Sequence, residues 1–142
     1  MLVVDSSVWI GFFNGADTPA VDLLSHLLDH AEIRLVVPDL VLFEVLRGFR
    51  HERDLRAARQ LMFSLSVEAT LGPTLYGQNT PADLCLQACD HYRALRGHGF
   101  TIRSALDVLV ASFCIENDYA LLHHDRDFDA FEQWRGLRVW RH

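Results

Sequence analysis

The chain begins with a short apolar run that ends abruptly in a carboxylate, and this arrangement limits the folds open to it. Leu2–Val4 is rich in β-branched residues and predicts a fully buried strand, which Asp5 ends. Ser6 and Ser7 follow where a helix should begin. In open α/β sheets the chemistry lies at the carboxyl ends of the central strands. We therefore expect Asp5 to lie at a functional edge of a sheet.

The rest of the chain alternates predicted strands with predicted helices. Strands are expected over 33–37, 67–68, 119–123 and 137–140. Helices are expected over 6–14, 19–28, 39–48, 54–65, 83–96, from Thr101 or Ser104 to about 117, and over 127–134. This alternation is typical of a parallel sheet covered by helices on both faces. No repeat or long linker divides the chain, so we expect one domain over 1–142, with 70–81 as its clearest loop.

All 13 cationic side chains are arginines, and the chain contains no lysine. This composition excludes phosphate-binding loops that need a lysine, Schiff-base chemistry and Ser–Lys catalysis. A formal net charge of −6 excludes a generally basic protein that coats nucleic acid. Arginine nevertheless suits bidentate phosphate contacts and stacking on bases.

The three cysteines, Cys85, Cys89 and Cys114, form neither an even set nor a C-x-x-C pair. A disulfide framework or a zinc ribbon is therefore not expected. Because Cys85 and Cys89 share a helix face, we expect them to pack into the core and all three thiols to be structural. The chain also lacks a signal peptide and an apolar run of about 20 residues, so we expect a soluble, cytoplasmic protein without a membrane partner.

Several carboxylates lie in apolar surroundings. Asp5 follows Leu-Val-Val, Glu44 lies within Leu-Val-Leu-Phe-Glu-Val-Leu, and Asp107 lies within Ala-Leu-Asp-Val-Leu-Val-Ala. A further cluster around Asp125, His-His-Asp-Arg-Asp-Phe-Asp, follows a predicted strand. We expect these groups to converge at one edge of the sheet, where divalent cations would offset their repulsion and the cost of burying them. Hard oxygen ligands of this kind suit Mg²⁺ or Mn²⁺.

Each carboxylate also has a purely structural interpretation. Asp5 could cap the helix that follows it. Asp107 falls near a helix N-terminus, where the helix dipole favours a negative charge. Glu44 could form a buried salt bridge with Arg47 or Arg103. Asp127 and Asp129 could be the surface start of a helix. Only the convergence of the set favours a metal site.

The ordered motifs resemble those of PIN domains, and more narrowly the VapC-type toxins of toxin–antitoxin pairs. The motifs are the Asp-Ser-Ser after the first strand, Leu-Phe-Glu-Val-Leu-Arg-Gly, Gly-Phe-Thr-Ile-Arg-Ser-Ala-Leu-Asp, and Leu-Leu-His-His-Asp-Arg-Asp-Phe. The resemblance covers essentially the whole chain and implies a single PIN domain over 1–142. The implied fold is a three-layer α/β/α sandwich with a central, mostly parallel sheet. Two departures are Ser6, where the family often has Thr, and a loop over 71–81 that is longer than the family's usual connection.

The resemblance also implies a function, a Mg²⁺-dependent endoribonuclease in which Mn²⁺ can replace Mg²⁺. The metal-binding and catalytic roles fall on Asp5, Glu44, Asp107 and Asp125. Ser7 and Asp127 would support these ligands. A water activated by one or two metal ions would hydrolyse the RNA phosphodiester without a side-chain nucleophile. A cognate antitoxin is expected to inhibit the enzyme with a segment that crosses the active site, and a homodimer is also implied.

Arg47 and Arg103 are the predicted substrate-binding residues, since each lies within about one helical turn of a proposed ligand in the sequence. They could equally balance the charge of the acidic pocket. His123 and His124 lie next to the acidic cluster, but alternation along a strand would let only one point at the site, and we assign neither a catalytic role.

Two other classes of protein compete with a nuclease. A phosphatase of the haloacid-dehalogenase type would use Asp5 as a nucleophile, but Ser7 replaces its second aspartate and its lysine is missing. A receiver-type signalling domain fails on the same missing lysine. A catalytically inactive PIN-like module that binds RNA or protein stays open as the alternative.

Overall fold

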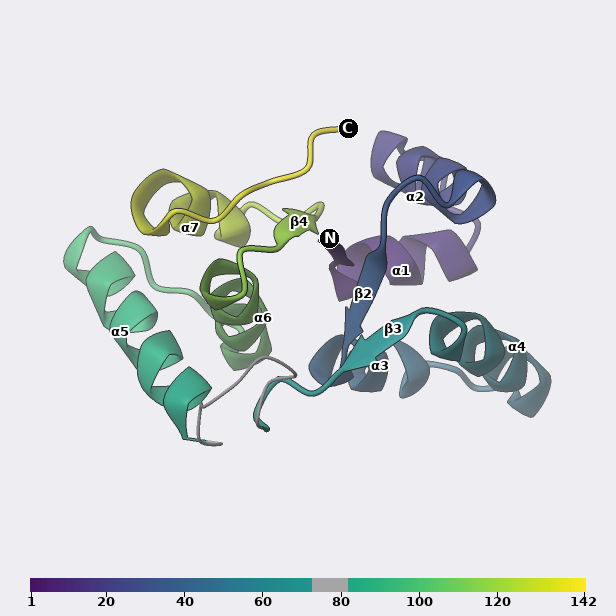
Figure 1. The fold of residues 1–142 in the computed structure, drawn as a ribbon, viewed down its shortest axis with the longest axis horizontal. Helices are drawn as coiled ribbons and strands as arrows, with labels where there is room; N and C mark the ends of the chain where they lie inside the picture. Colours follow the sequence, from purple (N-terminus) through teal and green to yellow (C-terminus); the bar gives the residue numbers. More distant parts are fainter. Residues whose placement is uncertain (73–81) are drawn as a thin grey trace.

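The computed structural model describes residues 1–72 and 82–142, and its centre is a four-stranded parallel sheet (Figure 1). The strand order is β3 (Ser66–Glu68), β2 (Leu35–Pro38), β1 (Leu2–Val4) and β4 (Ala120–Leu122). All three pairings are parallel, and Val3 of β1 aligns with Val36 on one side and Leu121 on the other. Since β1 has a neighbour on each side, Asp5 leaves the sheet at the middle of its carboxyl edge.

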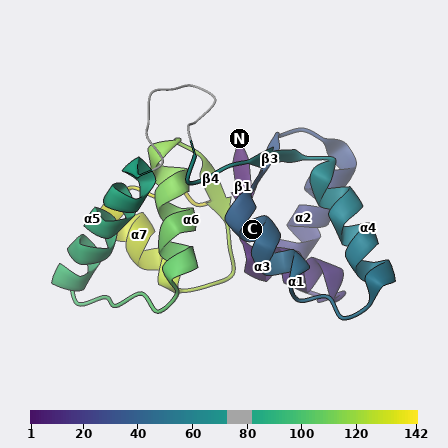
Figure 2. The same ribbon diagram turned by 90° about the horizontal axis from the view of Figure 1, so that it is seen from below.

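Seven helices among the described residues cover this sheet. They are α1 (Ser6–Phe13), α2 (Pro19–His30), α3 (Asp39–Leu46), α4 (Glu52–Phe63), α5 (Asp83–Gly97), α6 (Ala105–Glu116) and α7 (Asp127–Arg135). Figure 2 shows α5, α6 and α7 grouped on one side of the strands and the first four helices on the other. The predicted three-layer α/β/α sandwich is therefore confirmed, and within the described residues its sheet is wholly parallel.

The side chains of the sheet and of the helices that cover it form the core. The three residues of β1 are completely buried, as the β-branched run predicts. Trp9 is also fully buried and stacks on Phe13, so it contributes to this core rather than to a free surface. The helix α6, apolar nearly all round, lies at the centre of its layer and contacts α5 and α7.

Helix α5 shows that the prediction for two of the three cysteines was wrong. The buried face of α5 carries Leu84, Ala88, His91 and Leu95. Cys85 and Cys89 are each one position further round the helix and are exposed, whereas Cys114 is buried. Spacing alone showed that Cys85 and Cys89 share a face but not which face meets the core.

The predicted last strand over 137–140 is also wrong, because only a single bridge between Val139 and Leu121 forms there. The N–H of Leu121 donates to the carbonyl of Arg138, and the N–H of Trp140 donates to the carbonyl of Leu121. Both bonds are made by the backbone of Leu121, so the C-terminal segment pairs with β4 at this one residue and forms no regular strand. Most of the predicted loop, 73–81, lies outside the described residues.

A buried histidine connects the three helices of one layer. Nε of Arg135 in α7 donates to Nδ1 of His91 in α5 at 2.9 Å, and Nε2 of His91 lies 3.1 Å from Oε1 of Glu116 in α6. Because a guanidinium only donates, Nδ1 must accept and Nε2 must carry the proton toward Glu116.

No helix in the described part of the chain is long and apolar enough to span a bilayer.

Candidate metal centre

Asp5 both caps a helix and presents a free carboxylate oxygen. Its Oδ2 accepts hydrogen bonds from the backbone N–H of Ser7 at 3.1 Å and from the Ser7 hydroxyl at 2.6 Å. Its Oδ1 is buried with no partner among the described residues, and the residue is only 2% exposed. Capping of the helix therefore explains the contacts of Oδ2 and leaves Oδ1 available to a bound cation.

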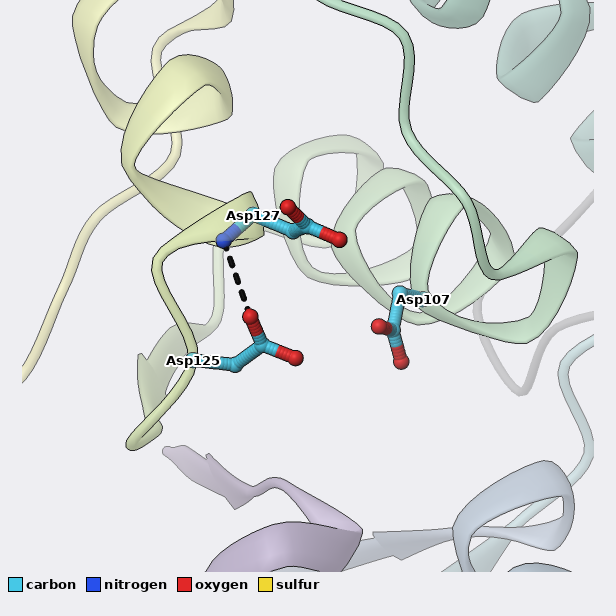
Figure 3. Close-up of side chains that lie close together, drawn as sticks. All are labelled: Asp107, Asp125 and Asp127. Carbon is cyan, nitrogen blue, oxygen red and sulfur yellow. Dashed lines mark hydrogen bonds between the residues drawn. The ribbon is translucent and has the colours of Figure 1, made fainter.

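Asp107 enters the same region from the first turn of α6. Ser104 caps this helix, and its hydroxyl accepts the N–H of Asp107 at 3.2 Å. The cap fixes where the helix begins, and so places Asp107 with its side chain directed at the carboxyl edge of the sheet (Figure 3). Asp107 is only 9% exposed.

The chain after β4 supplies two more carboxylates, Asp125 in the loop and Asp127 at the start of α7. Oδ1 of Asp125 accepts the N–H of Asp127 at 2.9 Å, a bond drawn in Figure 3. The N–H of Asp125 in turn donates to Nδ1 of His123 at 3.2 Å, which fixes the start of the loop. Asp107, Asp125 and Asp127 each offer one oxygen within 4.8 Å of the others. This spacing is small enough for one cation to contact all three side chains.

Glu44 approaches the group from α3, on the opposite side from α6. Its Oε1 is buried and has no partner among the described residues, and the nearby side chain of Ser6 favours the ionised form of Glu44 without outweighing burial. The structure shows no ion pair between Glu44 and either Arg47 or Arg103. The guanidinium of Arg47 lies instead 5.7 Å from the centre of the Phe43 ring. The buried salt bridge considered for Glu44 is therefore absent among the described residues.

The raised pKa values of Asp5, Glu44 and Asp107 show that their surroundings oppose negative charge. Burial first, and then the charges of Asp5, Asp125, Glu44 and Asp127, raise the pKa of Asp107 to about 7. Burial is also the main cause that raises the pKa of Asp5 and of Glu44. Each upward shift in pKa means that ionising the group costs free energy, which a bound cation would recover.

The structure brings the predicted ligands together and adds Asp127, which was predicted only as a supporting residue. Asp107 and Asp125 belong to the closest group, and Asp127, predicted only to support them, is its third member. Asp5 and Glu44 adjoin this group and are coupled to Asp107 by charge. These hard carboxylate oxygens, two of them buried and unpartnered, suit a divalent cation such as Mg²⁺ or Mn²⁺.

His123 and Ser6 lie at the site, although neither was predicted from the sequence to have a role there. His123 is buried, and burial lowers its pKa, which agrees with a neutral ring that accepts the N–H of Asp125. The position of His123, directly before the acidic cluster in the sequence, was the signal that could have predicted its place at the site. For Ser6 only the Asp-Ser-Ser motif pointed to the site. The two predicted arginines differ: Arg103 lines a groove beside Asp125 and Asp127, and Arg47 is not among the residues that line it.

A parallel α/β/α sandwich with carboxylates gathered at the carboxyl edge of its sheet defines the class of this protein. The family model of the PIN domain matches residues 2–133, so the chain belongs to the PIN-domain family. Among curated relatives, ribonuclease VapC11 of Mycobacterium tuberculosis is 26% identical over 140 residues, which cover 98% of this chain and 97% of the relative. VapC ribonuclease Mb1587 of Mycobacterium bovis matches with the same identity and coverage.

Solved structures with the same fold include toxin–antitoxin complexes. VapBC2 from Rickettsia felis, bound to a DNA fragment from its promoter, matches with a TM-score of 0.72 and 14% identity, over 98% of this chain and 96% of that one. VapC20 of Mycobacterium tuberculosis, a toxin that cleaves the sarcin–ricin loop, matches with a TM-score of 0.63 and 20% identity, over 92% and 94% of the two chains. At these identities the structural matches establish the fold.

Proposed function

We propose that this protein is a divalent-metal-dependent endoribonuclease and the toxin of a VapBC-type pair. The observation that carries the proposal is the close group of Asp107, Asp125 and Asp127, with oxygens within 4.8 Å of one another. The unpartnered oxygens of Asp5 and Glu44 adjoin this group. Membership of the PIN family and the ribonuclease names of the relatives support the same activity. Residues 1–142 would act as a single PIN domain.

The site residues divide into ligands and groups that position them. Asp5, Glu44, Asp107 and Asp125, with Asp127, would hold Mg²⁺, or Mn²⁺ in its place. When bound, the ion lowers the pKa of a coordinated water and stabilises negative charge on the phosphate. Ser7 holds Asp5 with one oxygen turned away from the helix cap, and His123 holds the loop that carries Asp125. These hydrogen bonds from neighbouring residues fix the orientation of the carboxylates that would bind the metal.

The test is hydrolysis of structured RNA by the purified protein. We expect cleavage with Mg²⁺ or Mn²⁺, no cleavage with excess chelator, and loss of cleavage in D5N and D107N. The matched control is D29N, which neutralises an exposed aspartate of α2 far from the group in the sequence. If D5N and D107N cleave like the parent and chelator has no effect, the protein is not a metal-dependent nuclease. Folded protein that binds RNA but never cleaves it would instead support the inactive module.

An antitoxin partner follows from the VapBC complexes among the structures of the same fold. We propose that a cognate antitoxin inhibits the enzyme by covering the acidic group. Coexpression with the product of a small neighbouring gene should yield a complex in which RNA cleavage is suppressed. Cleavage at the parent rate by a purified complex would contradict inhibition.

The homodimer is also proposed, and its surface would include exposed apolar residues on neighbouring helices. Ile10 of α1 is 43% exposed and Phe43 of α3 is 58% exposed, and the two helices pack together. Size-exclusion chromatography with light scattering should show a dimer that F43E dissociates and that L86E, at an exposed leucine of α5, does not. A monomeric parent protein would contradict the proposal.

A further inference from the structure

Two histidines lie one turn apart on the outer face of α2. The inner face of this helix, which includes Leu24 and Leu27, is buried, and the helix packs on α1. His26 and His30 are both exposed on the other side. Residues four apart on a helix are neighbours in space, so the two imidazoles share one face. A helix held in place by its packing therefore presents two imidazoles together before any ligand binds.

The rings of these two histidines already lie against each other. Their centroids are 4.1 Å apart, and their planes differ by 27°. Bonds between a metal ion and an imidazole nitrogen are about 2.0–2.1 Å long, so two nitrogens that share an ion lie at most about 4.2 Å apart. The separation of the rings matches this span. One cation can therefore contact both side chains without a change in the backbone.

The tautomer of His30 makes its outer nitrogen a ligand. Nδ1 of His30 lies 2.9 Å from the carbonyl oxygen of His26. Because a carbonyl only accepts, Nδ1 must carry the proton and donate it to this bond. In the neutral ring, Nε2 then has the lone pair that binds a metal. Histidines that bind metals almost always donate their other ring N–H in this way, which fixes the ring and makes the ligand more basic.

The position of the pair in the helix also favours a cation. His30 is the last residue of α2, where the helix dipole is negative. The exposed Asp22 lies one turn before His26 and adds negative charge to the same face. Imidazole nitrogens suit transition-metal ions such as Cu²⁺, Ni²⁺ and Zn²⁺, whereas Mg²⁺ prefers oxygen ligands. The histidine pair therefore differs in its metal preference from the carboxylate group.

We propose that His26 and His30 form a second metal site, which binds one transition-metal ion such as Cu²⁺ or Ni²⁺ and leaves its other coordination positions to water. The bound ion joins the last two turns of α2. Figures 1 and 2 both place α2 on the opposite side of the sheet from α6 and α7, which carry Asp107 and Asp127. Binding at the histidine pair is therefore independent of the ion at the carboxylate group and of the nuclease activity.

The test is calorimetric titration of the purified, metal-free protein with Ni²⁺, with Mg²⁺ in excess throughout. We expect H26Q and H30Q each to weaken one Ni²⁺ site by at least about 10-fold, because loss of a ligand costs at least as much as loss of a group that orients one. H51Q is the matched control, since His51 is exposed and has no second histidine one turn away in the sequence. D107N, which alters the carboxylate group, should keep the site that H26Q and H30Q lose.

Electron paramagnetic resonance of bound Cu²⁺ gives an independent readout. We expect splitting from two imidazole nitrogens in the parent, H51Q and D107N, and its loss in H26Q and H30Q. Parent-like Ni²⁺ affinity in H26Q and H30Q would overturn the proposal, and so would an equal loss in H51Q or a Cu²⁺ spectrum that neither substitution changes. Circular dichroism would show that each variant is folded. Because neither measurement contains RNA, its result is separate from the test of the nuclease.

Discussion

The hydroxyl of Ser7 donates a 2.6 Å hydrogen bond to Oδ2 of Asp5, while Oδ1 of the same carboxylate is buried without a partner among the described residues. A helix cap needs only the first of these oxygens, which also accepts the backbone N–H of Ser7. The second oxygen costs free energy unless it meets a cation or a donor. The sequence Asp-Ser-Ser therefore begins a helix and orients a ligand with the same residues.

The substitution S7A should separate these two functions. The backbone N–H that caps α1 remains, so the melting temperature should change little. Asp5 loses the bond that fixes its rotation, and we expect RNA cleavage or Mg²⁺ affinity to fall by about 10- to 100-fold, as for other groups that orient metal ligands. S7T, which restores the hydroxyl, should recover most of the activity. Unchanged cleavage by S7A would show that the hydroxyl does not position Asp5.

The substitution D107N should have opposite effects on activity and on stability. Cleavage should fall by at least about 100-fold, since a ligand matters at least as much as the groups that orient it. Burial and neighbouring carboxylates raise the pKa of Asp107, so its charge opposes folding when no metal is bound. Metal-free D107N should therefore melt about 2–8 °C above the parent at pH values above 7. A lower melting temperature would contradict the repulsion; scanning calorimetry in chelator measures it.

The pH dependence follows from the same carboxylate. Its pKa is about 7 in the folded protein, against an ordinary value of 3.8, so the folded state binds more protons across that interval. The free energy of unfolding of the metal-free protein should then fall as the pH rises through this window. Mg²⁺ affinity should rise over the same window, because the metal binds the ionised form. Thermal melts with and without Mg²⁺ test both trends, and D107N should flatten each of them.

The sequence predicted the parts of the site that depend on local pattern. The β-branched run that ends in Asp5 predicted that this residue lies at the carboxyl edge of the sheet. The apolar helix around Asp107 predicted that its carboxylate is buried and needs a partner such as a cation. The close approach of Asp127 to Asp107 could not be predicted, because it depends on how α7 packs against α6. The errors have the same origin: which face of α5 is buried, and how far the segment around Val139 pairs with β4, are decided by packing partners distant in the sequence.

The histidine that joins α5, α6 and α7 should matter for stability rather than for chemistry. H91L removes the acceptor of Arg135 and the donor to Glu116, and leaves both charged groups without this partner. We expect the free energy of unfolding to fall by about 1–3 kcal/mol. H51L, at an exposed histidine whose side chain caps nothing, should change it by less than about 0.5 kcal/mol. Urea denaturation measures both, and equal values for the two variants would show that the buried network contributes nothing.

The two arginines predicted to bind substrate should differ in the salt dependence of RNA binding. Arg103 lines the groove beside Asp125 and forms no ion pair with the described residues, whereas Arg47 is engaged with the Phe43 ring. Affinity falls as salt rises, because each phosphate contact releases counterions. R103A should therefore reduce the magnitude of the slope of log affinity against log salt by about 1, and R47A should leave that slope nearly unchanged. R53A, at an exposed arginine of α4, controls for net charge. If R53A and R103A lower the slope equally, the effect is one of overall charge; if R47A lowers it more than R103A, the RNA follows the α3 side of the site instead.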